Sequence, residues 1–356
     1  MNQPPAESWR GWRILSAVPR VLCIATAILA WTISAAAQAP DRLAAGRDEF
    51  RAGNFSRAAV LFDEAEAEAP GSTEALLLEG RAYTHLEQYP AAESALRRYL
   101  QLHADSDEAL YLLGYLLHRQ NRAAESLATY TKAARLRAPR GDDLKIVGLN
   151  YVLLNDYPDA IQWLEKAVQA EPENKEAWYF LGRAYYSRSR MGEAAKAFSK
   201  TLELDPKDSK GENNLGLVLE AEAKIDAALE AYRHAIEWQS QDRHPSEQPY
   251  LNLGSLLLDQ SRLAEAVPNL QKAVELAPGN AACELKLGAA YLRLEKLQEA
   301  LLHLTKAVAL APEDPAGHYQ LGKVYKALKM ANRAKVEFEK TEELQRRAAS
   351  PATKPD

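Results

Sequence analysis

Cysteine is nearly absent from this sequence, and glycine and proline are not enriched. The 356 residues include two cysteines, and only Cys283 lies outside the N-terminal apolar segment described below. One cysteine cannot form an intramolecular disulfide, so packing has to supply the stability. We expect Cys283 to be a small buried apolar residue. The 17 glycines and 18 prolines are ordinary numbers, which excludes a collagen-like or low-complexity chain.

A surplus of positive charge is also lacking. The net charge is −5 at pH 7, while 47% of the residues are hydrophobic. Nucleic-acid binding needs clustered lysine and arginine to meet the phosphate backbone, so we expect no nucleic-acid partner. The apolar fraction is large enough to bury a substantial core.

Short signatures of catalysis and of metal binding are missing as well. The seven histidines are spread along the chain without HExxH or another close metal pair. The sequence contains no GxSxG, no GxxxxGK[ST] and no Rossmann glycine fingerprint. No pair of carboxylates stands out from the acidic residues expected on helix faces. We therefore expect no enzymatic activity, no cofactor and no metal site.

The apolar run VLCIATAILAWTISAAA, residues 21–37, follows three arginines and ends in small residues. A basic start, a short apolar core and an Ala-x-Ala site are typical of a secretory signal peptide, here cleaved after Ala37. The alternative is a retained membrane anchor, although 17 residues are fewer than the roughly 20 of a spanning helix. We expect export to a bacterial periplasm or secretion, with membrane contact only if residues 21–37 remain attached.

Glycine recurs with a fixed period, which is the first sign of internal repeats. Six glycines lie 34 residues apart, and three more continue the series after one step of 38: Gly46, Gly80, Gly114, Gly148, Gly182, Gly216, Gly254, Gly288 and Gly322. Twelve residues after each glycine stands an alanine or, once, a serine. Prolines close many of these segments, at Pro70, Pro172, Pro206, Pro278 and Pro312.

Each period of 34 residues predicts two amphipathic helices of about 13 residues, because its apolar residues follow 3-and-4 spacing. A glycine inside a helix costs about 1 kcal/mol relative to alanine. Its recurrence indicates that two helix backbones cross too closely there for a larger side chain. We therefore expect Gly182→Leu to destabilise the protein.

The recurring glycines, alanines and prolines resemble the tetratricopeptide repeat pattern W-x2-L-G-x2-Y…A-x3-F…P. In the fifth repeat this pattern is matched by Trp178, Leu181, Gly182, Tyr185, Ala194, Phe198 and Pro206. The resemblance implies an all-α protein, an α-solenoid of tandem helix-turn-helix repeats that forms a right-handed superhelix. It covers nine repeats: 39–72, 73–106, 107–140, 141–174, 175–208, 209–242, 247–280, 281–314 and 315–348. We expect residues 349–356 to be a disordered tail.

Four extra residues, Arg243 to Ser246, interrupt the period between the sixth and seventh repeats. Two interpretations remain open. The insertion is either a tolerated loop, since lengthening a loop costs little, or a hinge between a block of six repeats and a block of three.

The resemblance also implies a binding surface. In this family the first helix of each repeat lines a concave face, and repeat positions 2, 5, 9, 12 and 13 point into it. The candidate groove residues are Arg81, Tyr111, Tyr115, His118, Lys145, Tyr179, Arg183, Tyr186 and Asn213. In the stretch EAWYFLGRAYY (176–186), we expect Trp178, Leu181, Gly182 and Tyr185 to be buried, with Tyr179, Arg183 and Tyr186 facing the groove.

Tyr115 and Arg183 are the strongest candidates, because packing at position 9 requires neither residue. Tyrosines mixed with cations suit an extended peptide. The chaperone-binding carboxylate clamp, with Lys at position 5 and Asn at position 9, is not expected, because Leu149 stands where Lys145 would need its asparagine.

The sequence therefore predicts a non-catalytic protein–protein interaction scaffold that binds a protein or peptide segment in a concave groove. Two other functions stay open: a membrane-anchored assembly factor of a bacterial envelope complex, and an accessory subunit that binds a glycan or small molecule. A groove without a dedicated ligand is a further possibility.

Overall fold

The computed structural model describes residues 41–349, so the expected signal peptide and the tail from residue 350 lie outside the described residues. The described part contains the helices α2 to α19 and no strand, which confirms the expected all-α class. Within residues 41–349, no helix is both long and apolar enough to cross a membrane.

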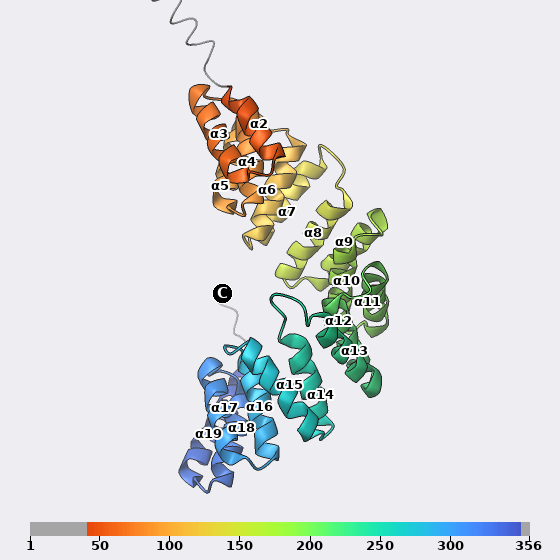
Figure 1. Ribbon diagram of the computed structural model, residues 1–356, viewed down its shortest axis with the longest axis vertical. Coiled ribbons are helices and arrows are strands. Elements are labelled where there is room, and N and C mark those ends of the chain that lie inside the picture. The colour runs from red at the N-terminus through yellow and green to blue at the C-terminus, as the bar shows by residue number, and fades with distance from the viewer. Residues whose placement is uncertain (1–40, 350–356) are drawn as a thin grey trace, which may run out of the picture. The chain divides into compact units, whose positions relative to one another are not determined.

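Every 34-residue repeat contains one pair of helices joined by a short turn (Figure 1). The pairs are α2 (Arg42–Arg51) with α3 (Phe55–Glu68), α4 (Thr73–His85) with α5 (Tyr89–Leu102), α6 (Asp107–Arg119) with α7 (Ala123–Ala134), α8 (Gly141–Leu153) with α9 (Tyr157–Ala170), α10 (Lys175–Ser187) with α11 (Met191–Leu204), α12 (Ser209–Ala221) with α13 (Ile225–Trp238), α14 (Gln248–Asp259) with α15 (Leu263–Leu276), α16 (Ala281–Arg293) with α17 (Leu297–Leu310), and α18 (Pro315–Ala327) with α19 (Ala331–Ala349).

The described helices group into two compact units, divided between Gln120 and Asn121. The described part of the first unit holds α2 to α6, and that of the second unit holds α7 to α19. The division falls inside the third repeat and does not coincide with the insertion at residues 243–246.

Polar caps start the first helix of several repeats. The Asn174 side chain accepts a hydrogen bond from the Ala177 amide at 3.0 Å, and Asp208 accepts one from the Gly211 amide at 2.7 Å. Each cap satisfies an amide that has no partner inside its helix. The cap, together with the preceding proline-containing turn, sets where the next repeat begins.

A large side chain covers the periodic glycines. Phe198 is fully buried, and a Cβ added to Gly182 would lie 2.7 Å from its Cε1 atom. The partner stands 16 residues after the glycine in each described case: Gly46 with Phe62, Gly80 with Leu96, Gly148 with Leu164, Gly182 with Phe198, Gly216 with Tyr232, Gly254 with Leu270, Gly288 with Leu304, and Gly322 with Phe338. The space above each glycine is thus filled first by a side chain of the second helix, rather than by the opposing backbone that the sequence suggested.

The turn inside each helix pair contains one residue with positive φ, again at the repeat spacing. In the first repeat it is Gly53, and in the others it is Glu87, Asn121, Asn155, Ser189, Ala223, Ser261, Glu295 and Lys329. At Ala223 (φ 59°), the amide of Lys224 donates to the Leu219 carbonyl and that of Ala223 to the Glu220 carbonyl, each at 2.9 Å. These two bonds form a Schellman cap, and they hold residues other than glycine in a conformation that costs about 1 kcal/mol.

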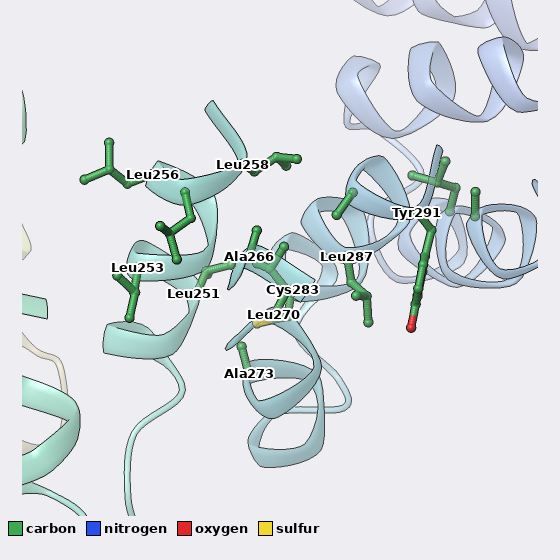
Figure 2. Packing of buried hydrophobic residues seen from close by; sticks show 14 of the residues in the cluster. Leu251, Leu253, Leu256, Leu258, Ala266, Leu270, Ala273, Cys283, Leu287 and Tyr291 are labelled. Atoms are coloured by element: carbon green, nitrogen blue, oxygen red, sulfur yellow. The ribbon is translucent and has the colours of Figure 1, made fainter. Parts of the chain in front are cut away.

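The largest apolar cluster lies in the second compact unit, around α14 to α16 (Figure 2). Leu270 and Cys283 are fully buried there, and Leu287 is 1% exposed. Burial, followed by the nearby carboxylates of Glu247 and Glu284, raises the pKa of the Cys283 thiol to about 11. The thiol is therefore protonated at neutral pH, and Cys283 packs as the small apolar residue that we expected.

One buried carboxyl group of the first compact unit has an oxygen atom without a hydrogen-bond partner. Glu79 of α4 is 6% exposed, and its Oε2 atom has no hydrogen-bond partner. Burial, and then repulsion from Asp63, raises the pKa of Glu79 to about 7, although the Arg98 guanidinium acts in the opposite direction. Glu66, which pairs with Arg98 at 2.6 Å, adds to the repulsion.

The glycine contact predicts a specific stability effect. Gly182→Ala should lower the free energy of unfolding by about 1–2 kcal/mol, because the Phe198 ring has to move and the gain in helix propensity only partly offsets this. Gly192→Ala is the matched control: Gly192 also lies in a helix, but no atom lies within 4 Å of its added Cβ. Thermal denaturation of both variants tests the contact. Equal melting temperatures would contradict it.

Glu79 predicts a pH dependence of stability. Between the usual glutamate value of 4.5 and about 7, the folded chain binds more protons at this site than the unfolded chain does. The free energy of unfolding should therefore fall by about 1–3 kcal/mol as the pH rises through this range. Glu79→Gln removes the effect. Amide hydrogen exchange of α4 is measured for the wild type and for Glu79→Gln at pH 5 and at pH 8. If the ratio of the two exchange rates is the same at both pH values, the predicted pH dependence is wrong.

Candidate functional site

The first helices of successive repeats form one continuous layer in the second compact unit. Helices α8, α10, α12, α14, α16 and α18 contact one another in sequence, whereas no comparably close contact joins successive second helices among the described residues. In a curved stack, the layer whose helices approach each other is the inner one. The first helices therefore line the concave face of this unit, and the second helices line its convex face.

The stretch 176–186 on α10 divides largely as the sequence predicts. Leu181 and Gly182 are buried, and Tyr185 is 8% exposed. Trp178 differs, because it is only half-buried and its indole Nε1 donates to the Pro172 carbonyl at 2.8 Å. Its polar edge thus ties α10 to the preceding turn.

Arg183 and Tyr179 form a pair on the concave side of α10. The Arg183 guanidinium lies over the Tyr179 ring, with 5.9 Å between Cζ and the ring centroid. Arg183 is exposed, and it makes no ion pair with any described carboxylate. A guanidinium held over an aromatic face without a counter-ion is available to an anionic partner. Tyr186 lies one turn further on and is half-buried against the adjoining apolar cluster.

Lys145 is buried and paired with carboxylates of the protein, whereas a cation that binds a ligand has to be accessible and unpaired. It is 9% exposed, and its Nζ atom lies 2.9 Å from Asp142 and 2.7 Å from Glu176. Burial alone would lower the pKa of Lys145, but its hydrogen bonds to these carboxylates outweigh burial and raise it. Its charge is satisfied within the protein, so Lys145 links α8 to α10 and has little to offer a ligand.

Four of the nine candidates lie in the first compact unit. Arg81 of α4 forms an ion pair with Glu108 of α6. Tyr111 is 6% exposed and belongs to the core, whereas His118 is half-buried. The Tyr115 hydroxyl accepts a hydrogen bond at 2.6 Å from the guanidinium of Arg119. These contacts leave the first unit without an exposed cation comparable to Arg183 among the predicted residues.

A cavity of about 220 Å³ opens beside Tyr179. Its walls come from α10, from the start of α12, from the segment that precedes α14, and from the first residues of α14. Asn213, a predicted site residue, lines the cavity and is 6% exposed. Its Oδ1 atom accepts a hydrogen bond from Asn252 at 2.9 Å. The structure thus brings Tyr179, Arg183 and Asn213 together on one concave surface.

The four-residue insertion forms one wall of this cavity. Gln239 is 2% exposed, and its side-chain amide makes two reciprocal hydrogen bonds with the backbone of Ser246: Nε2 donates to the carbonyl at 2.8 Å, and Oε1 accepts from the amide at 2.9 Å. His244 and Ser246 both line the cavity. The insertion is therefore a fastened loop with a definite place in the surface.

Only Tyr179 and Asn213 of the residues that line the cavity were predicted as site residues, and Lys210, Gln239 and His244 are among those that were not. Lys210 occupies position 2 of its repeat, which is one of the positions that face the groove, so the periodicity could have found it. The break in the period marked His244 only as part of an insertion. Nothing in the sequence indicated that Gln239 would fasten the loop.

Several histidines pair with glutamates inside the second compact unit. The Nδ1 atom of His303 lies 2.6 Å from Glu284, and that of His318 lies 2.6 Å from Glu337. Glu284 is only 1% exposed, so its pairing with His303 satisfies a buried carboxylate. Within residues 41–349, no group of three histidine, cysteine, aspartate or glutamate side chains is arranged to hold a metal ion.

Comparison with known proteins identifies the repeats. Family models described as tetratricopeptide repeat match residues 49–107, 86–141, 148–209, 213–242 and 246–313. A solved tetratricopeptide repeat protein from Parabacteroides merdae aligns with a TM-score of 0.57 at 19% identity, covering 71% of this chain and 98% of that one. This likeness and the helix pairs confirm the expected α-solenoid of tandem repeats.

Two curated relatives match over shorter stretches. The human protein O-mannosyl-transferase TMTC1 is 27% identical over 203 residues, covering 56% of this chain and 22% of that protein. The cytochrome c-type biogenesis protein CycH of Pseudomonas aeruginosa is 30% identical over 118 residues, covering 32% of this chain and 28% of that protein. The chain thus spans about a quarter of the length of each relative.

Proposed function

Because the chain belongs to the tetratricopeptide repeat family, we propose that it is a non-catalytic scaffold for protein–protein interaction. The bound partner is a peptide or protein segment, and it lies against the concave face of the second compact unit. A repeat solenoid suits this role, because it presents an extended surface without a separate catalytic domain.

The observation that carries this proposal is the state of Arg183. Its guanidinium is exposed, stacked over Tyr179 and without a carboxylate partner among the described residues. Lys145, on the neighbouring helix α8, is neutralised by two carboxylates of the protein. Of these two cations, Arg183 is therefore the one that contributes more binding free energy to an anionic partner, since an arginine–carboxylate contact is strong and directional.

The concave face also offers side-chain contacts that suit an extended segment. Tyr179 offers an aromatic face, and its hydroxyl accepts a hydrogen bond from Asn214 at 3.3 Å, which leaves the hydroxyl proton free to donate. Aromatic and arginine side chains are the residues that contribute most at protein interfaces. The cavity beside Tyr179 gives the same surface a pocket for one side chain of the partner.

A second candidate is an assembly factor of a bacterial envelope complex. The relationship to CycH, whose name places it in cytochrome c-type biogenesis, favours this alternative. In both cases we propose that the chain is exported, on the strength of the basic and apolar pattern in residues 10–37. The alternative also requires residues 21–37 to remain as an anchor.

The N-terminus of the exported protein distinguishes the two. The scaffold proposal predicts a mature species that begins near Gln38, measured as the intact mass of protein isolated from the envelope fraction. A full-length mass, together with recovery in the membrane fraction, would favour the anchored assembly factor.

A charge reversal tests the groove. Arg183→Glu should reduce the capture of the natural partner from the cell envelope about tenfold or more, because a carboxylate then faces the partner's anion. Lys196→Glu is the matched control: Lys196 is an exposed cation of the convex helix α11, and it has no described ion pair. Quantitative mass spectrometry of the captured proteins gives the readout, with thermal denaturation to show that both variants fold. Equal capture by both variants would refute the groove assignment.

A further inference from the structure

The cavity beside Tyr179 contains a hydrogen-bond donor without a partner among the described residues. Asn213 is 6% exposed and lines the cavity, and its Oδ1 atom is occupied by Asn252. Its Nδ2 group has no hydrogen-bond partner among the described residues. Nδ2 is therefore the donor that this largely buried side chain can offer to a ligand in the cavity.

The surroundings of this donor favour negative charge. Lys210 lines the cavity, is exposed and makes no ion pair with any described carboxylate. The cavity is also lined by the first two residues of α12, Ser209 and Lys210, and by the first two of α14, Gln248 and Pro249. Helix N-termini carry partial positive charge, so two of them reinforce the lysine.

The acidic residues close to these helix starts are mostly engaged elsewhere. Asp208 accepts from the Gly211 amide and pairs with Lys175 at 2.7 Å, while Glu247 accepts from Asn280 at 3.2 Å. Asp242 is the one carboxylate in the cavity lining. A single lysine opposed by a single aspartate fits a monoanion, and it disfavours the greater charge of a phosphate group.

We propose that this cavity binds the carboxylate of one acidic residue of the partner segment. Lys210 supplies the opposite charge, Asn213 donates through Nδ2, and the loop fastened by Gln239 closes the cavity on one side. This inference rests on the proposed function and specifies it further. It makes the four-residue insertion part of a specificity pocket, neither a hinge nor a passive loop.

Peptide pools test the proposal with the full chain immobilised. The pools are acetylated, C-terminally amidated 12-residue peptides with Glu, Gln or Ala at a fixed central position and no other acidic residue. The Glu pool should be retained about tenfold more than the Gln pool, because a charged hydrogen bond replaces a neutral one. A further pool, free of acidic side chains but with a free C-terminus, shows whether a chain end can supply the carboxylate instead.

Variants of the lining identify the cavity as the source of the preference. Lys210→Met should abolish the preference for Glu over Gln, Asp242→Asn should increase it, and Lys196→Met on the convex face should leave it unchanged. All three positions are exposed, so none of these substitutions threatens folding. A preference that survives Lys210→Met overturns the proposal.

The outcomes separate this inference from the proposed function. If the wild-type chain retains the pools above background, yet Glu and Gln bind equally, the groove stands and the carboxylate pocket is wrong. If the wild-type chain retains no pool above background, the proposed function and the proposed carboxylate pocket are both wrong.

Discussion

The contact between each periodic glycine and the large side chain 16 residues later is the constraint on which the fold depends. It occurs in both compact units, for example at Gly46 with Phe62 and at Gly182 with Phe198. Because no Cβ separates the two helices there, a ring or a leucine of the second helix packs directly on the backbone of the first. This fixes how the two helices of a repeat cross, and thereby which side of the first helix stays free to line the concave face.

Most of the fold could be predicted because it depends on local periodicity. The period of 34 placed the helix pairs, and the small residues marked where the helices cross. The turn inside each pair was not predictable in the same way. Its left-handed residue is glycine only at Gly53 and otherwise glutamate, asparagine, serine, alanine or lysine, because the Schellman hydrogen bonds hold the conformation whatever the side chain.

The candidate site was predictable only in part, because charge pairing depends on tertiary neighbours. Lys145 and Arg183 look alike as cations at groove positions. Lys145 is neutralised by Asp142 in its own helix and by Glu176, 31 residues away, whereas Arg183 meets no described carboxylate. Repeat register indicates that both side chains face the groove, but it does not indicate which of them already has partners.

The fastening of the loop by Gln239 has a consequence for how such a protein diversifies. The Gln239 side chain donates one hydrogen bond to the backbone of Ser246 and accepts the other from it, so neither bond depends on which side chains the loop carries. The residues between these anchor points can therefore vary while the flanking helices keep their packing. A few substitutions in the loop can therefore change which ligands this pocket binds, while the stability of the solenoid stays the same.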